Sequence, residues 1–330
     1  MNNSLSNITH LLLASSIGLY LLIIGKNLLV PLIIAVVIWY LIVSITDVLE
    51  RHKLPHALAL GVSILLCIIV MTGIVLLVNS NISALIQELP KYQEKFTNII
   101  IRISEHYSID LADEINKFFK EINITKFFSD SALVITNIAG KIGLISIYVL
   151  FLLLEYRNFD RKLEKMFVHK KNYKHALSII HQIAHDINLY LKIKTFTSLT
   201  TGIISYIILV AVGVDFAEFW ALLIFLFNYI PTIGSIIAVI FPVVISVVQF
   251  QSLFWFVLIL SLLVSVQIIV GNIIEPRLMG KSLNLSPLVI LISLAFWASV
   301  WGIIGAFLCI PITDILHLVF AKFEKTRPLA

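Results

Sequence analysis

Charged side chains are scarce in this sequence. Only 13% of its 330 residues are Asp, Glu, Lys or Arg, about half the share of roughly 25% that is typical of soluble domains. By contrast, 59% of the residues are hydrophobic and the mean hydropathy is +1.01. This small share of charged residues cannot cover a globule with polar surface. The composition therefore excludes a soluble globular domain and predicts an integral membrane protein.

Cysteine is scarce too, and a cleavable leader is missing. The two cysteines, Cys67 and Cys309, both lie inside apolar runs, where a thiol behaves as a small buried hydrophobic group. They provide neither a disulfide framework nor a metal-ligand spacing. The start, MNNSLSNITH, has no Lys or Arg, and no small-residue cleavage site follows the first apolar run. That run is therefore predicted to be a retained membrane span rather than a signal peptide.

The motifs that would mark an enzyme are incomplete. HQIAH (181–185) spaces two histidines by one helical turn, but Gln182 stands where a metalloprotease has Glu. GKS (280–282) resembles the end of a phosphate loop, but Glu275 replaces the glycine required five residues earlier. The sequence therefore predicts no catalytic residue, no metal, no cofactor and no direct use of ATP. The net charge of +5 does not indicate nucleic-acid binding, because the basic residues cluster beside apolar runs.

Long apolar runs dominate the rest of the chain. A spanning helix needs roughly 20 mostly apolar residues, and six such runs occupy about 9–25, 27–46, 57–80, 134–155, 197–214 and 253–270. Two further runs are interrupted, 216–250 by NYIPTIGS (228–235) and 286–320 near WASVWGIIG (297–305). Each half could be a short span or one arm of a re-entrant hairpin. The predicted fold is all-α: a polytopic membrane protein with about six full transmembrane helices and two Gly/Pro-interrupted helical hairpins, in a single permease domain over 1–330.

The placement of Lys and Arg predicts the orientation of the chain. Basic residues follow the runs at 27–46, 134–155 and 253–270, and they also end the chain. Since cytoplasmic loops are enriched in positive charge, both termini and the basic amphipathic segment 156–196 are predicted to be cytoplasmic. Within that segment, 172–195 is predicted to be a separate helix along the headgroup layer. The amphipathic helical segment 81–131 is predicted to be extracytoplasmic.

NYIPTIGS is the first candidate for a transport pathway. Pro231 lacks an N–H group, and Gly234 allows a close approach of backbone. The carbonyl groups that the break frees need partners, which at membrane depth means protein or a water-lined cavity. Asn228, Tyr229 and Thr232 provide polar groups nearby. The alternative is a simple turn at the membrane interface.

GNIIEPRLMG (271–280) is the second candidate. Glu275 and Arg277 are predicted to form the cytoplasmic rim of a pathway, with Asn272 one turn deeper, because an ionisable residue in a membrane is a functional candidate. Pro276 favours an extended Glu275 and so predicts that the helix ends there. The alternative is that both charged side chains reach the interface and anchor the end of the helix.

Both candidates belong to a longer resemblance. GVDFAEFWALLIFLFNYIPTIGSIIAVIFPVVISV and GNIIEPRLMGKSLNLSPLVILISLAFWASVWGIIGAFLCIPIT resemble the autoinducer-2 exporter family, the PerM-like permeases. The resemblance is strongest from about 186 to 314. It implies a bacterial inner-membrane transporter, homo-oligomeric, with members linked to export of a quorum-sensing signal or to sodium/proton antiport. One departure is YLKIK (190–194) in place of Tyr-Leu-Arg-Gly-Gln, which indicates a divergent branch whose substrate need not be the signalling molecule.

Three functional hypotheses remain open on the sequence. The leading one is a permease that exports small hydrophilic solutes, driven by H+ or Na+ rather than ATP. The second is a sodium/proton antiporter, for which Glu275, Asp47 and Asp314 are the candidate carboxylates. The third is a non-transporting membrane scaffold, which has no need of irregular backbone in lipid.

Overall fold

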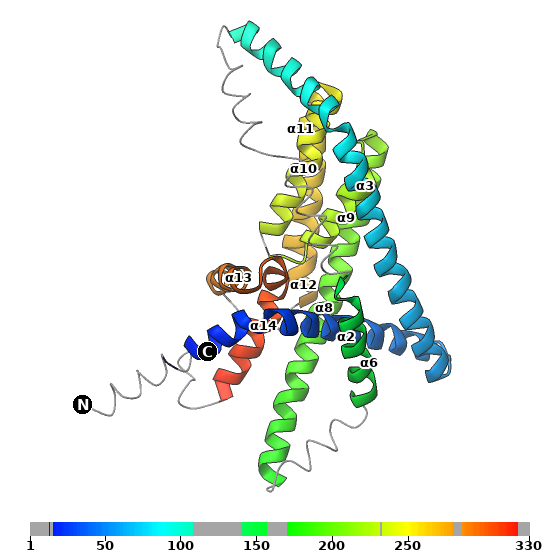
Figure 1. The fold of residues 1–330 in the computed structure, drawn as a ribbon, viewed down its shortest axis with the longest axis vertical. Coiled ribbons are helices and arrows are strands. Elements are labelled where there is room, and N and C mark those ends of the chain that lie inside the picture. The colour runs from blue at the N-terminus through cyan, green and yellow to red at the C-terminus, as the bar shows by residue number, and fades with distance from the viewer. Residues whose placement is uncertain are drawn as a thin grey trace, which may run out of the picture. The chain divides into compact units, whose positions relative to one another are not determined.

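The computed structural model describes residue 13 and residues 16–107, 140–156, 170–231, 233–279 and 286–322. Every regular element in these ranges is a helix (Figure 1). The chain divides into two compact units. The first contains residues 1–63, 141–188 and 283–330, and the second contains residues 64–140 and 189–282. Whether the units work as the predicted single permease domain stays a prediction.

The first unit is built from two packed helix pairs. Helix α2 (Lys26–Arg51) packs against α6 (Ile142–Tyr156), and α13 (Pro287–Trp301) packs against α14 (Ile303–Lys322) (Figure 1). Residues 16–24 are also helical and belong to the first predicted span. The Trp301 Nε1–H donates to the Leu22 carbonyl oxygen at 3.1 Å, which ties this helix to the end of α13.

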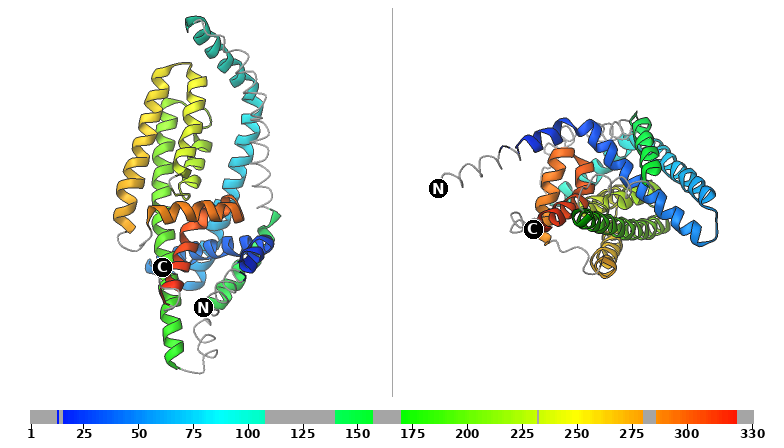
Figure 2. Two further views of the ribbon diagram at one scale, coloured as in Figure 1. Left: turned by 90° about the vertical axis from the view of Figure 1, so that its left-hand side faces the viewer. Right: turned by 90° about the horizontal axis from the view of Figure 1, so that it is seen from below.

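The second unit is a bundle of helices. It contains most of α3 (His56–Tyr107), the C-terminal part of α8 (Lys170–Val212), α9 (Ala217–Phe227), α10 (Ile233–Phe250) and α11 (Leu253–Gln267). The π-helix η1 (Ile268–Ile274) and the short α12 (Glu275–Met279) continue α11. In Figure 2, α8, α10 and α11 run side by side with nearly parallel axes.

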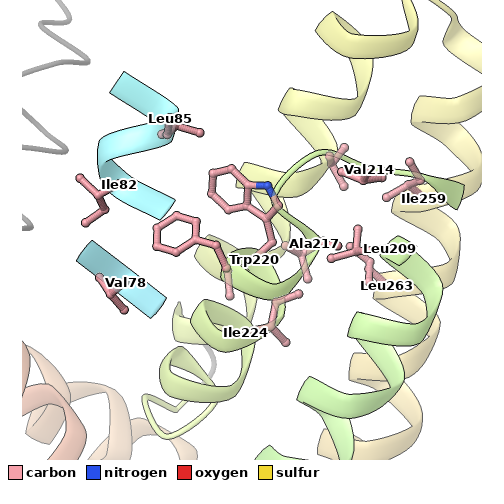
Figure 3. Close-up of a cluster of buried hydrophobic side chains, with 14 residues drawn as sticks. Val78, Ile82, Leu85, Leu209, Val214, Ala217, Trp220, Ile224, Ile259 and Leu263 are labelled. Atoms are coloured by element: carbon pink, nitrogen blue, oxygen red, sulfur yellow. The ribbon is translucent and has the colours of Figure 1, made fainter. Parts of the chain in front are cut away.

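An apolar cluster holds one end of this bundle together. Leu209 of α8 lies beside Ile259 and Leu263 of α11, while Trp220 of α9 lies toward α3 (Figure 3). These four side chains are at most 1% exposed. Each large apolar side chain buried in such a cluster stabilises the packing of the helices through many dispersion contacts. The cluster fixes the level at which α8 and α11 face each other.

Two helices are longer than the sequence predicts. The predicted segment 81–131 continues α3 without a break through Tyr107, even though Pro90 lies inside the helix; residues 108–131 are outside the described part. The predicted helix 172–195 and the span 197–214 form the single helix α8. The reason is local, because no Pro or Gly occurs between Lys170 and Thr201. The prediction of a separate amphipathic helix was wrong.

The two interrupted runs fold as predicted, each into two helices joined by a break. Helix α9 has 11 residues and α13 has 15, so at 1.5 Å per residue neither reaches the roughly 30 Å of a hydrocarbon core. Five helical stretches of the described residues are long and apolar enough to cross a membrane: Lys26–Arg51, His56–Ile99, Ile180–Val212, Ile233–Phe250 and Leu253–Met279. The all-α polytopic fold is confirmed.

Candidate functional site

One face of α8 carries polar side chains that are fully enclosed by protein. Lys194 is 5% exposed, and four hydroxyl residues follow it at spacings of three or four residues with at most 1% exposure: Thr197, Ser198, Thr201 and Ser205. Residues at such spacings lie on one side of a helix. Small polar residues at a membrane helix interface let neighbouring helices approach and form hydrogen bonds. A buried lysine among them is costly and points to function.

Lys194 forms an ion pair with Glu275. Its Nζ donates to Glu275 Oε1 at 2.7 Å, and the two side chains are 6% and 15% exposed. The Thr197 hydroxyl lies 3.2 Å from Glu275 Oε2 and also 3.2 Å from the Lys194 carbonyl oxygen, so it shares its proton between them. Both oxygens of the carboxylate are therefore held by α8. Charge-assisted bonds of this kind are stronger than neutral ones.

The NYIPTIGS break contacts the adjacent face of the same helix. Helix α9 ends at Phe227, and Asn228 Nδ2 then donates to Ser198 Oγ at 3.0 Å. The Tyr229 hydroxyl donates to Thr195 Oγ1 at 2.9 Å. Asn228 is 2% exposed, so its amide lies inside the bundle rather than at an open interface. Thr232 lies outside the described residues.

Glycine allows the helices on either side of the break to pack closely. A Cβ on Gly234 would lie 2.0 Å from the carbonyl oxygen of Phe227, the last residue of α9. The second interrupted run repeats this arrangement, because a Cβ on Gly305 would lie 1.9 Å from the carbonyl oxygen of Trp297. In both hairpins, therefore, only glycine lets the second helix pack against the last turns of the first. Pro231 is buried at the turn.

The region around Glu275 differs from its predicted geometry in two ways. Glu275 is helical, with φ −57° and ψ −49°, and the chain stays helical through Met279, so the prediction of a helix end at this residue was wrong. Pro276 lies inside the helical stretch Leu253–Met279, directly after Glu275, and it does not end the helix. The carboxylate pairs with Lys194, whereas Asn272, Pro276 and Arg277 are exposed on the surface of the chain.

Sequence reasoning missed the role of α8. In the sequence YLKIK stands out only as a departure from the family pattern, yet Lys194 holds Glu275, which is 81 residues away in the chain. The signal that could have revealed it is the recurrence of Lys, Thr, Thr and Ser at 194, 197, 201 and 205 inside an apolar span. Such a stripe predicts a buried polar face. It does not predict which helix covers that face.

The other two candidate carboxylates lie in the first unit. Asp314 is 6% exposed on α14. Asp47 lines a cavity of about 530 Å³ together with Glu50 and His56, which are hydrogen-bonded to each other, and with Val43, Thr46, Leu54, Leu60 and Leu153. Asp47, Glu50 and His56 are all exposed. Glu275, by contrast, is held by an ion pair and a hydroxyl among membrane helices.

A bundle of apolar helices with broken hairpins and enclosed polar groups defines a multi-pass membrane permease. The comparisons with known proteins place it further: the model of the AI-2E family transporters matches residues 11–325. The chain belongs to this family. The predicted resemblance is thereby confirmed.

Individual relatives cover most of the chain. A candidate transport protein of Borreliella burgdorferi is 32% identical over 88% of this chain and 80% of its own length. The AI-2 transport protein TqsA of Escherichia coli K12 is 30% identical over 93% of this chain and 89% of its own. YhhT of the same strain, also named as a candidate transport protein, is 28% identical over 81% and 77%.

Proposed function

We propose that this protein exports small hydrophilic solutes without hydrolysing ATP, and that a quorum-sensing signal is the first solute to test. The observation that supports the proposal is the group of enclosed polar side chains around residues 194–198 of α8. There the Glu275 carboxylate and the Asn228 amide, which lie far apart in the sequence, reach the same turn of one helix. Buried polar groups beside interrupted helices are typical of solute pathways in transporters. The name of TqsA supports AI-2 as the first solute.

The proposed pathway residues combine both motifs with α8. Glu275, Asn228 and Tyr229 contact α8 directly. Pro231 and Gly234 shape the break against α9. The full proposed set is Asn228, Tyr229, Pro231, Thr232, Gly234, Asn272, Glu275, Pro276 and Arg277, to which we add their contact residues Lys194, Thr195, Thr197 and Ser198.

A sodium/proton antiporter is the second candidate function. An antiporter needs at least one titrating carboxylate within the membrane. Glu275, which is enclosed together with Lys194, is a candidate for that group. In the export hypothesis the Glu275 carboxylate couples solute export to H+ or Na+. A non-transporting scaffold does not account for charges buried among membrane helices, which are costly there.

We propose a bacterial inner membrane location with both termini and 156–196 cytoplasmic, 81–131 on the other side, and assembly as a homo-oligomer. Assembly is supported by exposed polar residues on α11 and η1. Ser261 and Ser265 are exposed four residues apart on one side of α11, and Asn272 is exposed on η1. Polar residues exposed on a spanning helix are better covered by protein than by lipid.

Flux measurements in proteoliposomes separate the three candidates. Purified protein is reconstituted and tested for release of preloaded AI-2 and other small polar solutes, and separately for sodium movement against a pH gradient. An exporter releases solute, an antiporter moves sodium in exchange for protons, and a scaffold does neither. Absence of both fluxes from correctly inserted protein would contradict the proposal.

A further inference from the structure

We infer that Lys194 is a displaceable counter-ion that occupies the position a monovalent cation, H+ or Na+, takes on Glu275 during the transport cycle. The inference rests on the proposed function, and it assigns the ion site to Glu275, Thr197 and Lys194. In the described conformation the Lys194 ammonium is 2.7 Å from Glu275 Oε1. A cation is therefore already accommodated at this carboxylate, and it belongs to the protein itself.

Stability alone does not explain such a pair. Removing two charges from water costs about as much free energy as their attraction returns, and apolar residues of similar size often stabilise a core equally well. Removing only the lysine, however, leaves an uncompensated buried carboxylate, which is strongly unfavourable. The Thr197 hydroxyl donates one hydrogen bond but adds no charge. Whenever Lys194 leaves, Glu275 therefore has to gain another cation.

The lysine side chain is suited to leaving. Its ammonium is a compact charge on a flexible stem of four carbons, and such side chains extend along apolar surface toward water. Lys192, two residues earlier on α8, is exposed, whereas Lys194 is buried. Among the described titratable side chains, Lys194 is the one in contact with the Glu275 carboxylate, and Arg277 on its own helix is exposed.

The backbone beside Glu275 provides a way to break the pair. Glu275 directly follows η1, and its N–H bonds to the Val270 carbonyl, five residues earlier. Each π turn contains more residues than an α turn, so conversion between the two rotates Glu275 about the helix axis relative to α8. Such π segments are frequent at functional sites. Gly271 in the middle of η1 adds backbone freedom, and a Cβ there would meet no atom of the described residues within 4 Å.

A second buried polar group lies along the same contact. Gln267, about two turns before Glu275, has a buried Nε2 that finds no hydrogen-bond partner among the described residues. Glu275 pairs with Lys194 at one end of the contact, and Leu263 lies beside Leu209 at the other (Figure 3), so α8 and α11 are antiparallel. Gln267 therefore lies at the level of the buried Thr201 and Ser205. Unpaired buried amides are rare, and this one extends the polar contact beyond the ion pair.

Thermal unfolding with two cation probes tests the inference without measuring transport. Wild type, Lys194→Met and Lys194→Met/Glu275→Gln are placed in nanodiscs, and the unfolding midpoint is followed by tryptophan fluorescence. In one series sodium chloride replaces choline chloride at constant ionic strength. In the other, the pH falls from 8 to 5 in choline chloride. The first series reports Na+ binding and the second reports H+ binding.

Lys194→Met is expected to be stabilised by several degrees in at least one series, because its unpaired carboxylate binds the probe. In wild type, half of the same shift in unfolding midpoint should need at least a tenfold higher concentration of that cation, because the Lys194 ammonium competes with it for Glu275. The double variant should not respond. Lys192→Met removes an exposed lysine from the same turn and should respond like wild type.

An equal shift in unfolding midpoint for Lys194→Met and the double variant would overturn the inference. So would an equal cation concentration at half of the shift for wild type and Lys194→Met. If Lys194→Met does not assemble, wild type and Glu275→Gln are compared, and a response that survives in Glu275→Gln overturns it. Flux without any cation response would leave the proposed export intact and reject only this site. A cation response without flux would leave the site and reject export.

Discussion

Glu275 shows at the scale of single residues how α8 controls the polar groups of the bundle. Its two oxygens are held by Lys194 and Thr197, which lie one turn apart on α8. Arg277 is only two residues away in sequence, but a helical Glu275 and a helical Arg277 point to different sides of α12. Proximity in sequence therefore does not identify the partner of Glu275, because helical geometry favours partners three or four residues apart or on another helix.

The Asn228–Ser198 bond should contribute measurable stability. Replacing Asn228 or Ser198 by Ala removes a buried bond of 3.0 Å, and the double-mutant cycle should give a coupling free energy of about 0.6 kcal/mol, the average for hydrogen bonds between membrane helices. The measurement is the free energy of unfolding in bicelles. Ser299→Ala is the control, since this exposed hydroxyl donates to the Ala295 carbonyl oxygen of its own helix. Additive effects of the two changes would contradict the assignment.

At the scale of elements, the α9–α10 hairpin depends on Gly234. Gly234→Ala places a Cβ 2.0 Å from the Phe227 carbonyl oxygen, so α10 has to move away from α9. We expect a loss of about 1–3 kcal/mol of unfolding free energy, which is typical of overpacking, together with loss of flux.

Gly73→Ala is the matched control for this hairpin. It lies inside α3, and a Cβ there would meet no atom in the described part of the chain within 4 Å. Stability should stay equal or rise by up to about 1 kcal/mol, because Ala favours helix more than Gly does. Equal behaviour of the two alanine variants would show that close packing at Gly234 is unimportant.

The second half of α3 is attached to the bundle by a polar network. The Tyr92 hydroxyl donates to Asp215 Oδ2 at 2.6 Å, and Gln249 Nε2 donates to the other oxygen, Oδ1, at 3.1 Å. Lys95 Nζ donates to the Gln249 carbonyl at 3.3 Å. The network therefore joins α3, the start of α9 and the end of α10.

Tyr92→Phe should loosen this attachment. It removes a hydrogen bond to a charged group, worth about 1.5–3 kcal/mol, so amide hydrogen exchange in residues 81–99 should accelerate while exchange in α11 stays unchanged. Tyr206→Phe, at an exposed tyrosine of α8, is the control. Unchanged protection of residues 81–99 in Tyr92→Phe would show that apolar packing alone holds the helix.

At the scale of the whole molecule, apolar periodicity predicted the helices and the two interruptions well. Apolar periodicity failed to predict where the helix that contains residues 172–195 ends, and it failed to predict which helices contact each other. The amphipathic pattern of 172–195 suggested a separate helix, but nothing in the residues up to Thr201 breaks the backbone, and the helix continues. The contact between Lys194 and Glu275 could not be predicted, because the pattern of one helix does not specify its neighbour.

The predicted orientation can be measured by labelling single cysteines. In a background without Cys67 and Cys309, Ser108→Cys and Lys170→Cys should react with an impermeant thiol reagent from opposite sides of the membrane. The prediction follows from the excess of Lys and Arg after residue 156. Reaction of both positions from the same side would reject the topology.

The central claim, a solute pathway that depends on Glu275, is tested most directly by comparing the solutes that cells release. Cells without the protein, with the wild type and with Glu275→Gln, at equal amounts in the membrane, are compared by untargeted analysis of extracellular metabolites. Lys192→Gln serves as the control, because Lys192 is an exposed charge on α8, two residues from Lys194. We predict that one or more small hydrophilic solutes accumulate outside with wild type and Lys192→Gln, and that Glu275→Gln lowers their export at least tenfold, equivalent to about 1.4 kcal/mol. Equal extracellular solutes with wild type, with Glu275→Gln and without the protein would contradict the claim.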